Sequence, residues 1–260
     1  AIHQGITTLV TGNCGHGPAP CRNKDLAKQV TIGYSDNWDT DISWSSFGQY
    51  VDILFSPGLA VNVAPLVPHG AIRMAVMGYD DRKPTKIELN EMKAMVAEAM
   101  GSGAAGFSTG LEYSPGQYAE KEELIALTSV AAQHGGIYAS HIRNRADTFL
   151  DAVEEGLTII REAGLPGQLS HLAPRPYANR QFQDVLTTIN NAIGQEGLMV
   201  GIDTFPDLWA PGPAVTLLPS WVYEGNQDEV LTRLGSKDVL DRCRNSFLNT
   251  TNYLLRLGCF

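Results

Sequence analysis

Six short apolar runs, each long enough for a β-strand, alternate along this chain with segments that place apolar residues at helical spacing. This alternation predicts βαβ units and a parallel sheet, and right-handed crossovers favour a barrel or a doubly wound sheet. A closed barrel of this kind needs eight strands. We therefore expect an α/β fold: an incomplete (β/α)8 TIM-type barrel with about six of its eight parallel strands. The apolar runs end at Cys14, Val67, Thr109, His141, His171 and Phe205.

Helix signals separate these runs. Thr85 and Glu88 form the pattern of a capping box, and apolar residues follow at helical spacing as far as Met100. Four further helices are expected near residues 44–54, 120–132, 146–163 and 181–193. After the last strand the alternation stops. We expect residues 1–225 to form the partial barrel and residues 226–260 to be a C-terminal tail of uncertain structure.

Three of the apolar runs end in a residue that can bind a metal: Cys14, His141 and His171. In a barrel of parallel strands, the carboxyl ends of all strands meet at one mouth. Taken singly, each residue has a plainer explanation, since cysteine is often a small buried hydrophobe and histidine often a hydrogen-bonded structural residue. Their joint placement at three strand ends favours a metal site. A thiolate and two imidazoles suit zinc, which indicates a metallohydrolase.

Other residues near the predicted mouth have two interpretations each. Arg143, two residues after His141, would grip a carboxylate or form a surface ion pair. Tyr113 would donate its hydroxyl to an oxyanion or only pack in its loop. Asp203 is either a site residue or the cap of the following turn. Of the remaining histidines, His69 is expected to be structural or adjacent to the site, and His3 and His134 to lie on the surface. His16, only two residues after Cys14, is given no role.

The net charge of −9 and the pI of about 5.1 argue against an electrostatic grip on nucleic acid or on an anionic membrane. No apolar stretch approaches the ~20 residues of a transmembrane helix, and no signal-peptide pattern opens the chain. The 4 cysteines are sparse and form no C-x-x-C pair, which argues against a disulfide framework. We therefore expect a cytoplasmic protein.

Several segments together resemble one family. In chain order they are GITTLVTGNCGHGPAP, NVAPLVPHGAIR, GAAGFSTGLEYSPGQYA, YASHIR and LSHL. They are similar to the N-acyl-D-amino-acid deacylases (D-aminoacylases) of the amidohydrolase superfamily, and the likeness runs from Ala1 to about Trp221. The resemblance implies that Cys14, His141 and His171 bind zinc. It also implies a catalytic role for Tyr113 at the scissile carbonyl and a substrate-binding role for Arg143.

The activity implied by this resemblance is zinc-dependent hydrolysis of the amide bond of small-molecule N-acyl-D-amino acids, giving a carboxylate and a D-amino acid. Two alternatives stay open: another amidohydrolase reaction, such as cyclic-amide or carbamate hydrolysis, and a non-catalytic metal-binding protein. In each of them, the sulfur of Cys14 and one ring nitrogen of His141 and of His171 should lie within a few Å of one another.

Departures from the family pattern are also visible. The family's His-x-His pair precedes the GITT segment, and its catalytic aspartate has no convincing equivalent in residues 239–260. Ala173 stands where members usually carry a lysine, and residues 203–207 replace a tyrosine-rich segment. We therefore expect this chain alone to bind zinc with little or no turnover, and its amino-acid specificity is left open.

Overall fold

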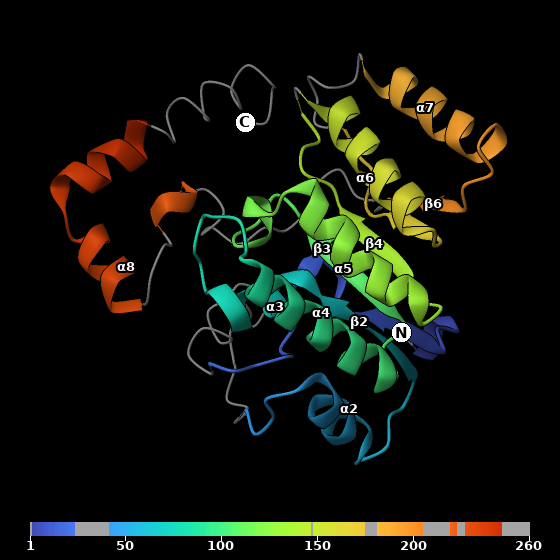
Figure 1. The fold of residues 1–260 in the computed structure, drawn as a ribbon, viewed down its shortest axis with the longest axis horizontal. Helices are drawn as coiled ribbons and strands as arrows, with labels where there is room; N and C mark the ends of the chain where they lie inside the picture. The colour runs from blue at the N-terminus through green and yellow to red at the C-terminus, as the bar shows by residue number, and fades with distance from the viewer. Residues whose placement is uncertain are drawn as a thin grey trace.

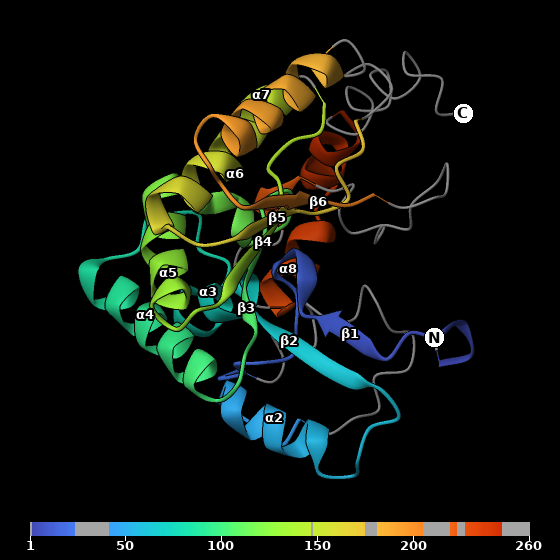
Figure 2. The same cartoon turned by 90° about the vertical axis from the view of Figure 1, so that its right-hand side faces the viewer.

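The computed structural model describes residues 2–23, 42–146, 148–174, 181–204, 219–222 and 227–245. Their six strands form one sheet in chain order, and every neighbouring pair is parallel. The sheet lies behind the helices in Figure 1 and curls into half of a barrel in Figure 2, which confirms the predicted incomplete (β/α)8 fold. The strands are β1 (Thr8–Thr11), β2 (Asn62–Pro68), β3 (Gly106–Gly110), β4 (Ile137–His141), β5 (Gly167–Leu169) and β6 (Val200–Ile202).

Helices cover one side of this sheet, and Figure 2 shows α4 to α7 stacked along it. Consecutive helices from α3 to α7 contact one another, so each crossover packs against the next. The core lies between these helices and the strands, where Phe107, Tyr138 and Leu157 are fully buried. The helices are α2 (Phe47–Phe55), α3 (His69–Met77), α4 (Lys86–Gly101), α5 (Lys121–Gln133), α6 (Phe149–Ala163), α7 (Phe182–Gly194) and α8 (Gln227–Leu234).

The predicted helices are present, and the capping box at the start of α4 has both of its hydrogen bonds. The Glu88 backbone N–H donates to Thr85 Oγ1 at 3.3 Å, and the Thr85 N–H donates to Glu88 Oε2 at 2.7 Å. The helix α3 has no counterpart in the sequence analysis. It is only 9 residues long and begins at His69-Gly70 directly after β2, where a proline and a glycine in the sequence indicate a turn.

Two predicted strands are shorter than the sequence indicated. β1 ends at Thr11, ahead of Cys14, and β5 ends at Leu169, ahead of His171. Both of these predicted metal ligands have positive φ angles, 58° for Cys14 and 38° for His171, and a strand cannot continue through that conformation. The predicted end of the sixth strand, Phe205, lies outside the described residues.

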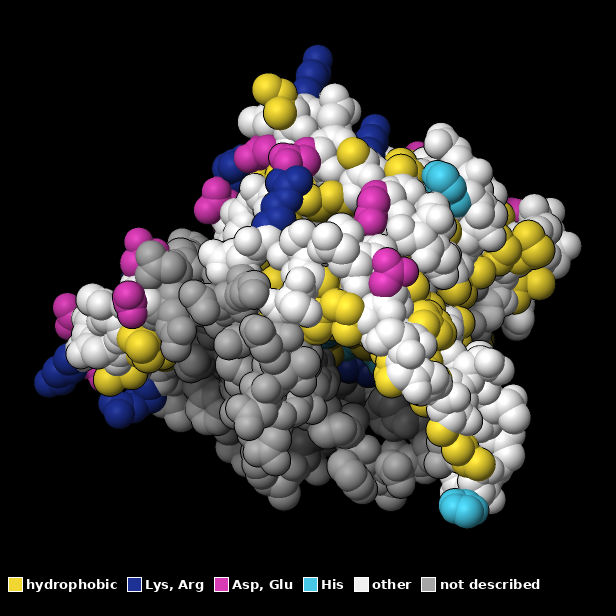
Figure 3. Space-filling model, turned by 90° about the horizontal axis from the view of Figure 1, so that it is seen from below, with side chains coloured by type: hydrophobic (Ala, Val, Ile, Leu, Met, Phe, Trp, Pro, Cys, Tyr) yellow, Lys and Arg dark blue, Asp and Glu magenta, His cyan; other side chains and the backbone are white. Residues whose placement is uncertain are grey.

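The two edge strands are more exposed than the central ones. All residues of β3 are buried, whereas Leu9 and Val10 in β1 are 38% and 51% exposed and Ile202 in β6 is 48% exposed. Figure 3 shows apolar side chains that reach the surface on one face of the molecule. Within the described part of the chain, no helix is long and apolar enough to cross a membrane.

Residues 227–245 of the predicted tail are largely helical, forming α8 and a second helical stretch at 237–245. Arg233 at the end of α8 donates a hydrogen bond to the carbonyl of Val222 at 2.6 Å, which joins the helix to the short η6 turn (Ser220–Val222). The domain boundary at residue 225 stays a prediction.

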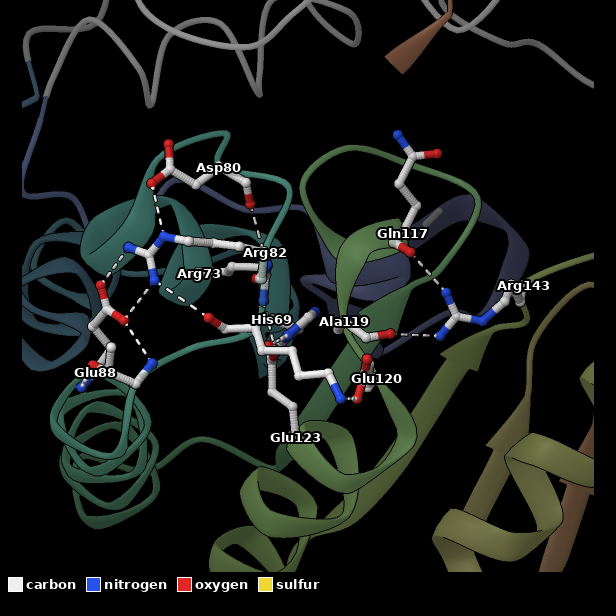
Figure 4. Close-up of polar contacts among 12 residues, drawn as sticks. His69, Arg73, Asp80, Arg82, Glu88, Gln117, Ala119, Glu120, Glu123 and Arg143 are labelled. Atoms are coloured by element: carbon white, nitrogen blue, oxygen red, sulfur yellow. Dashed lines mark hydrogen bonds and ion pairs between the residues drawn. The ribbon is translucent and has the colours of Figure 1, made fainter. Parts of the chain in front are cut away.

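A buried charge network joins α3 to α5 (Figure 4). The Glu123 carboxylate accepts a hydrogen bond from Arg73 Nη1 at 2.6 Å, and its other oxygen lies 2.9 Å from His69 Nε2. Burial raises the pKa of the Glu123 carboxyl, but the hydrogen bonds and charges of His69 and Arg73 outweigh it, so the pKa lies below its usual value. Arg73 also donates to the backbone carbonyls of Asp80 and Arg82. His69 is therefore a structural residue, one of the two roles expected for it.

We expect Glu123→Gln to destabilise the fold by about 3–5 kcal/mol, because the change leaves the fully buried Arg73 guanidinium without its counter-charge. Urea unfolding followed by circular dichroism measures this loss. Glu196→Gln is the matched control, since Glu196 pairs with Arg161 on the surface and should change stability little. Equal effects of the two substitutions would contradict the structural role of the buried network.

Candidate metal centre

Cys14 lies in a tight turn, η2 (Asn13–Gly15), that follows β1 and packs on the end of β3. Ser108 holds this turn, because its hydroxyl accepts a hydrogen bond from the Gly15 N–H at 3.2 Å and donates one to the Gly12 carbonyl. Gly110 permits the approach, since a Cβ there would lie 1.9 Å from the Cys14 carbonyl oxygen. The glycines of this turn and of β3 therefore fix where the sulfur is placed.

His171 follows β5 and is held by an aspartate from the next strand. The backbone N–H of His171 donates to Asp203 Oδ1 at 2.5 Å, and Gln168 donates to Asp203 Oδ2 at 2.7 Å. Asp203 therefore caps the turn at His171, whereas the turn after its own strand, which it was expected to cap, lies outside the described residues. Cys14 and His171 are the non-glycine residues with positive φ in the described chain, a conformation that costs about 1–3 kcal/mol and gathers at functional sites.

His141 is the last residue of β4 and is 1% exposed. Its Nε2 lies 2.9 Å from the carboxylate of Glu112, a residue that the sequence analysis did not single out. When Nε2–H donates to that carboxylate, the imidazole keeps its lone pair on Nδ1, which is the form that binds a metal. The signal available in the sequence was the position of Glu112 at the end of β3, directly before Tyr113.

The three predicted ligands converge. One ligand atom from each of Cys14, His141 and His171 lies within 4.8 Å of the other two, and Cys14 Sγ is 3.4 Å from His171 Nε2. Zinc bonds of ~2.3 Å to sulfur and ~2.05 Å to nitrogen separate two ligands of a tetrahedral ion by about 3.6 Å. The donor set therefore suits zinc, and the separation of Cys14 Sγ and His171 Nε2 is close to that of two ligands of one ion.

Burial sets the charge state of these groups. It raises the pKa of the Cys14 thiol to about 11, although the Arg145 charge opposes the rise. Burial lowers the pKa of His171 to about 4, and the positive charges of His141 and Arg145 act in the same direction. At neutral pH the His171 imidazole is therefore already neutral, whereas the thiol must lose its proton when an ion binds.

Tyr113 lies beside the cluster, with its ring centroid 4.5 Å from that of His141. The His16 ring lies 4.8 Å from the Tyr113 ring, centroid to centroid. Burial, followed by the charge of His141, lowers the pKa of His16 to about 4. This histidine, for which the sequence analysis gave no role, is therefore an uncharged imidazole beside Tyr113 at neutral pH. His3 and His134 are both exposed, as predicted.

The two arginines after β4 differ in their surroundings. Arg143 donates twice to Glu155 at 2.9 Å and once each to the carbonyls of Gln117 and Ala119, the latter two shown in Figure 4. Its predicted substrate contact would have to replace some of these bonds, and that role stays a prediction. Arg145, which the sequence analysis passed over, lies next to the cluster, with Nη1 3.4 Å from the His171 carbonyl.

No family model matches the chain, but both curated proteins and solved structures of deacylases are similar to it. An N-acyl-D-glutamate deacylase of Alcaligenes xylosoxydans xylosoxydans is 36% identical over 219 residues, which cover 83% of this chain and 43% of the relative. A crystal structure of a D-aminoacylase matches with 32% identity and a TM-score of 0.68, over 80% of this chain and 43% of that one.

A second solved structure is an N-acyl-D-glutamate deacylase from Bordetella bronchiseptica, complexed with zinc and a phosphonate inhibitor that mimics the tetrahedral intermediate. It is 35% identical, has a TM-score of 0.68, and is matched over 79% of this chain and 43% of its own length. The chain thus spans less than half the length of the relatives it matches.

We expect Cys14→Ala to abolish tight zinc binding, because only two imidazoles then remain of the three ligands. Elemental analysis after dialysis should give about one zinc per chain for the parent protein and close to none for the variant. Cys21→Ala is the control, since Cys21 is a buried cysteine outside the cluster. Retention of zinc by Cys14→Ala would contradict the assignment.

Glu112→Gln should weaken zinc binding about 10–100-fold, because the amide no longer favours the His141 tautomer that exposes the Nδ1 lone pair. Competition with a chromogenic chelator measures the affinity. Thermal unfolding in the absence of zinc separates this effect from a loss of folding. An unchanged zinc affinity would assign Glu112 a purely structural contact.

Proposed function

We propose, because the chain belongs to the N-acyl-D-amino-acid deacylase (D-aminoacylase) family, that it supplies the zinc-binding part of an enzyme that hydrolyses N-acyl-D-amino acids. The products would be a carboxylate and a free D-amino acid. The convergence of Cys14, His141 and His171 at one end of the parallel sheet is the observation that carries this proposal.

Each residue of the cluster has a defined task in this function. Zinc bound at this cluster would supply Lewis acidity toward a carbonyl and would lower the pKa of a water molecule. Cys14, His141 and His171 would hold the ion, while Glu112 fixes the ring orientation of His141 and Asp203 fixes the His171 turn. These contacts let the site form before substrate arrives.

Tyr113 is the residue that we assign to the reacting amide. Its ring packs on His141, which places it beside the ion's ligands. A phenolic O–H aimed at the carbonyl oxygen would stabilise the negative charge that develops there. One such donor can lower the activation barrier by about 3–4 kcal/mol.

The proton transfer from water to the leaving amine is assigned to none of the described residues. We therefore expect the 260-residue chain by itself to bind zinc and to turn over slowly or not at all. A panel of N-acetyl-D- and N-acetyl-L-amino acids, a cyclic imide and a carbamate distinguishes the deacylase from other amidohydrolase reactions. Zinc binding without turnover and without inhibitor binding would favour a non-catalytic metal-binding protein.

Tyr113→Phe should weaken the binding of a phosphonate analogue of N-acetyl-D-leucine by about 100-fold or more, because the phosphonate oxygen occupies the place of the oxyanion. Isothermal titration of the zinc-loaded chain measures this without requiring turnover. Tyr118→Phe is the control from the same loop, since the Tyr118 hydroxyl bonds to Ser114 instead. Equal losses in the two variants would argue against the catalytic assignment.

A further inference from the structure

Arg145 is a largely buried arginine whose hydrogen-bonding capacity is mostly unused. Its side chain is 15% exposed, and its Nε is buried without a hydrogen-bond partner. Its two described contacts are long, with Nη1 3.4 Å from the His171 carbonyl oxygen and Nη2 3.5 Å from Glu112 Oε2. Burying a guanidinium in this way is costly unless something else pairs with it.

These contacts place the guanidinium beside the metal centre. One partner is the carbonyl of the ligand His171, and the other is the carboxylate that bonds His141. The backbone N–H of Ala173 donates to the same His171 carbonyl at 2.7 Å, so Arg145 makes the longer of two hydrogen bonds to this acceptor.

We propose that Arg145 binds the free carboxylate of the N-acyl amino acid substrate, a role that rests on the deacylase function proposed above. A guanidinium presents two parallel N–H groups that match the two oxygens of a carboxylate. An α-carboxylate is separated from the scissile amide nitrogen by a single carbon atom. Its anchor must therefore lie close to the metal ligands, and Arg145 does.

Arg143, the other candidate, has a different environment. Its guanidinium is already engaged by the Glu155 carboxylate and two backbone carbonyls. It borders an open hollow of about 560 Å³ whose lining includes none of the three metal-ligand residues. The lining contains four carboxylates against two cationic side chains, a balance that disfavours an anionic ligand: Asp81, Glu120, Glu122 and Glu155 against Lys121 and Arg143.

Paired ligands that differ only in charge test this assignment. The affinities of N-acetyl-D-leucine and of N-acetyl-D-leucinamide are measured by ligand-detected NMR titration of the 260-residue chain, both zinc-loaded and metal-free. We expect the parent chain to prefer the acid by about tenfold or more, as for a charge-assisted hydrogen bond. In Arg145→Gln the ratio of the two affinities should fall to near one, and Arg145→Lys should retain part of it.

Two matched variants control for the loss of a positive charge. Arg161→Gln removes a surface arginine that pairs with Glu196, and Arg143→Gln removes the alternative anchor. Both should keep the preference for the acid. The zinc content and circular dichroism of Arg145→Gln show whether its site is intact, and Arg145→Lys serves as the test variant if the glutamine variant does not fold.

The possible results separate this inference from the deacylase function. A preference that survives in folded Arg145→Gln, that is lost in Arg143→Gln instead, or that is absent from the parent chain overturns the role of Arg145. If the parent chain takes up zinc but does not distinguish acid from amide, only the Arg145 assignment fails. If it takes up no zinc yet prefers the acid through Arg145, the zinc function fails and the assignment stands.

Discussion

The parallel register of the central strands is the constraint on which the site depends. Gly110 pairs with His141 across β3 and β4, and Ser140 pairs with Leu169 across β4 and β5. Because the strands run in the same direction, their carboxyl ends form one rim, and residues more than a hundred positions apart meet there. The turn that carries Cys14 completes the cluster by packing on β3, where glycine allows two backbones to touch.

Negative charges from neighbouring elements hold this rim in place. Glu112 at the end of β3 fixes the ring of His141, and Asp203 after β6 fixes the turn of His171. Each of the two histidines is therefore positioned by a carboxylate that follows a neighbouring strand, whereas Ser108 holds the turn that carries Cys14. Arg145 contacts both the Glu112 carboxylate and the His171 carbonyl, and its positive charge offsets part of this negative charge. The site consequently depends on the sheet as a whole, because no single βα unit contains both a ligand and the group that orients it.

The sequence predicted what depends on periodicity and left out what depends on contacts. Alternating strand and helix patterns were sufficient for the half-barrel, and the position of His141 at a strand end was readable directly. The helix α3 was not predicted because it is short and begins directly after β2, at a Pro-His-Gly sequence that indicates a turn. Glu112 and Arg145 were not identified as site residues because their roles come from contacts with residues distant in the sequence, His141 and His171. Arg143 was the more obvious arginine by position, yet its side chain turns to Glu155.

The left-handed backbone at Cys14 has a consequence for changing the metal preference of such a site. A substitute ligand must bind an ion and must also tolerate a φ of 58°. Histidine, aspartate and asparagine adopt this conformation more readily than most residues, whereas β-branched side chains resist it. Engineering this position toward harder cations is therefore feasible with aspartate, because its carboxylate oxygen suits such ions and its backbone accepts the turn.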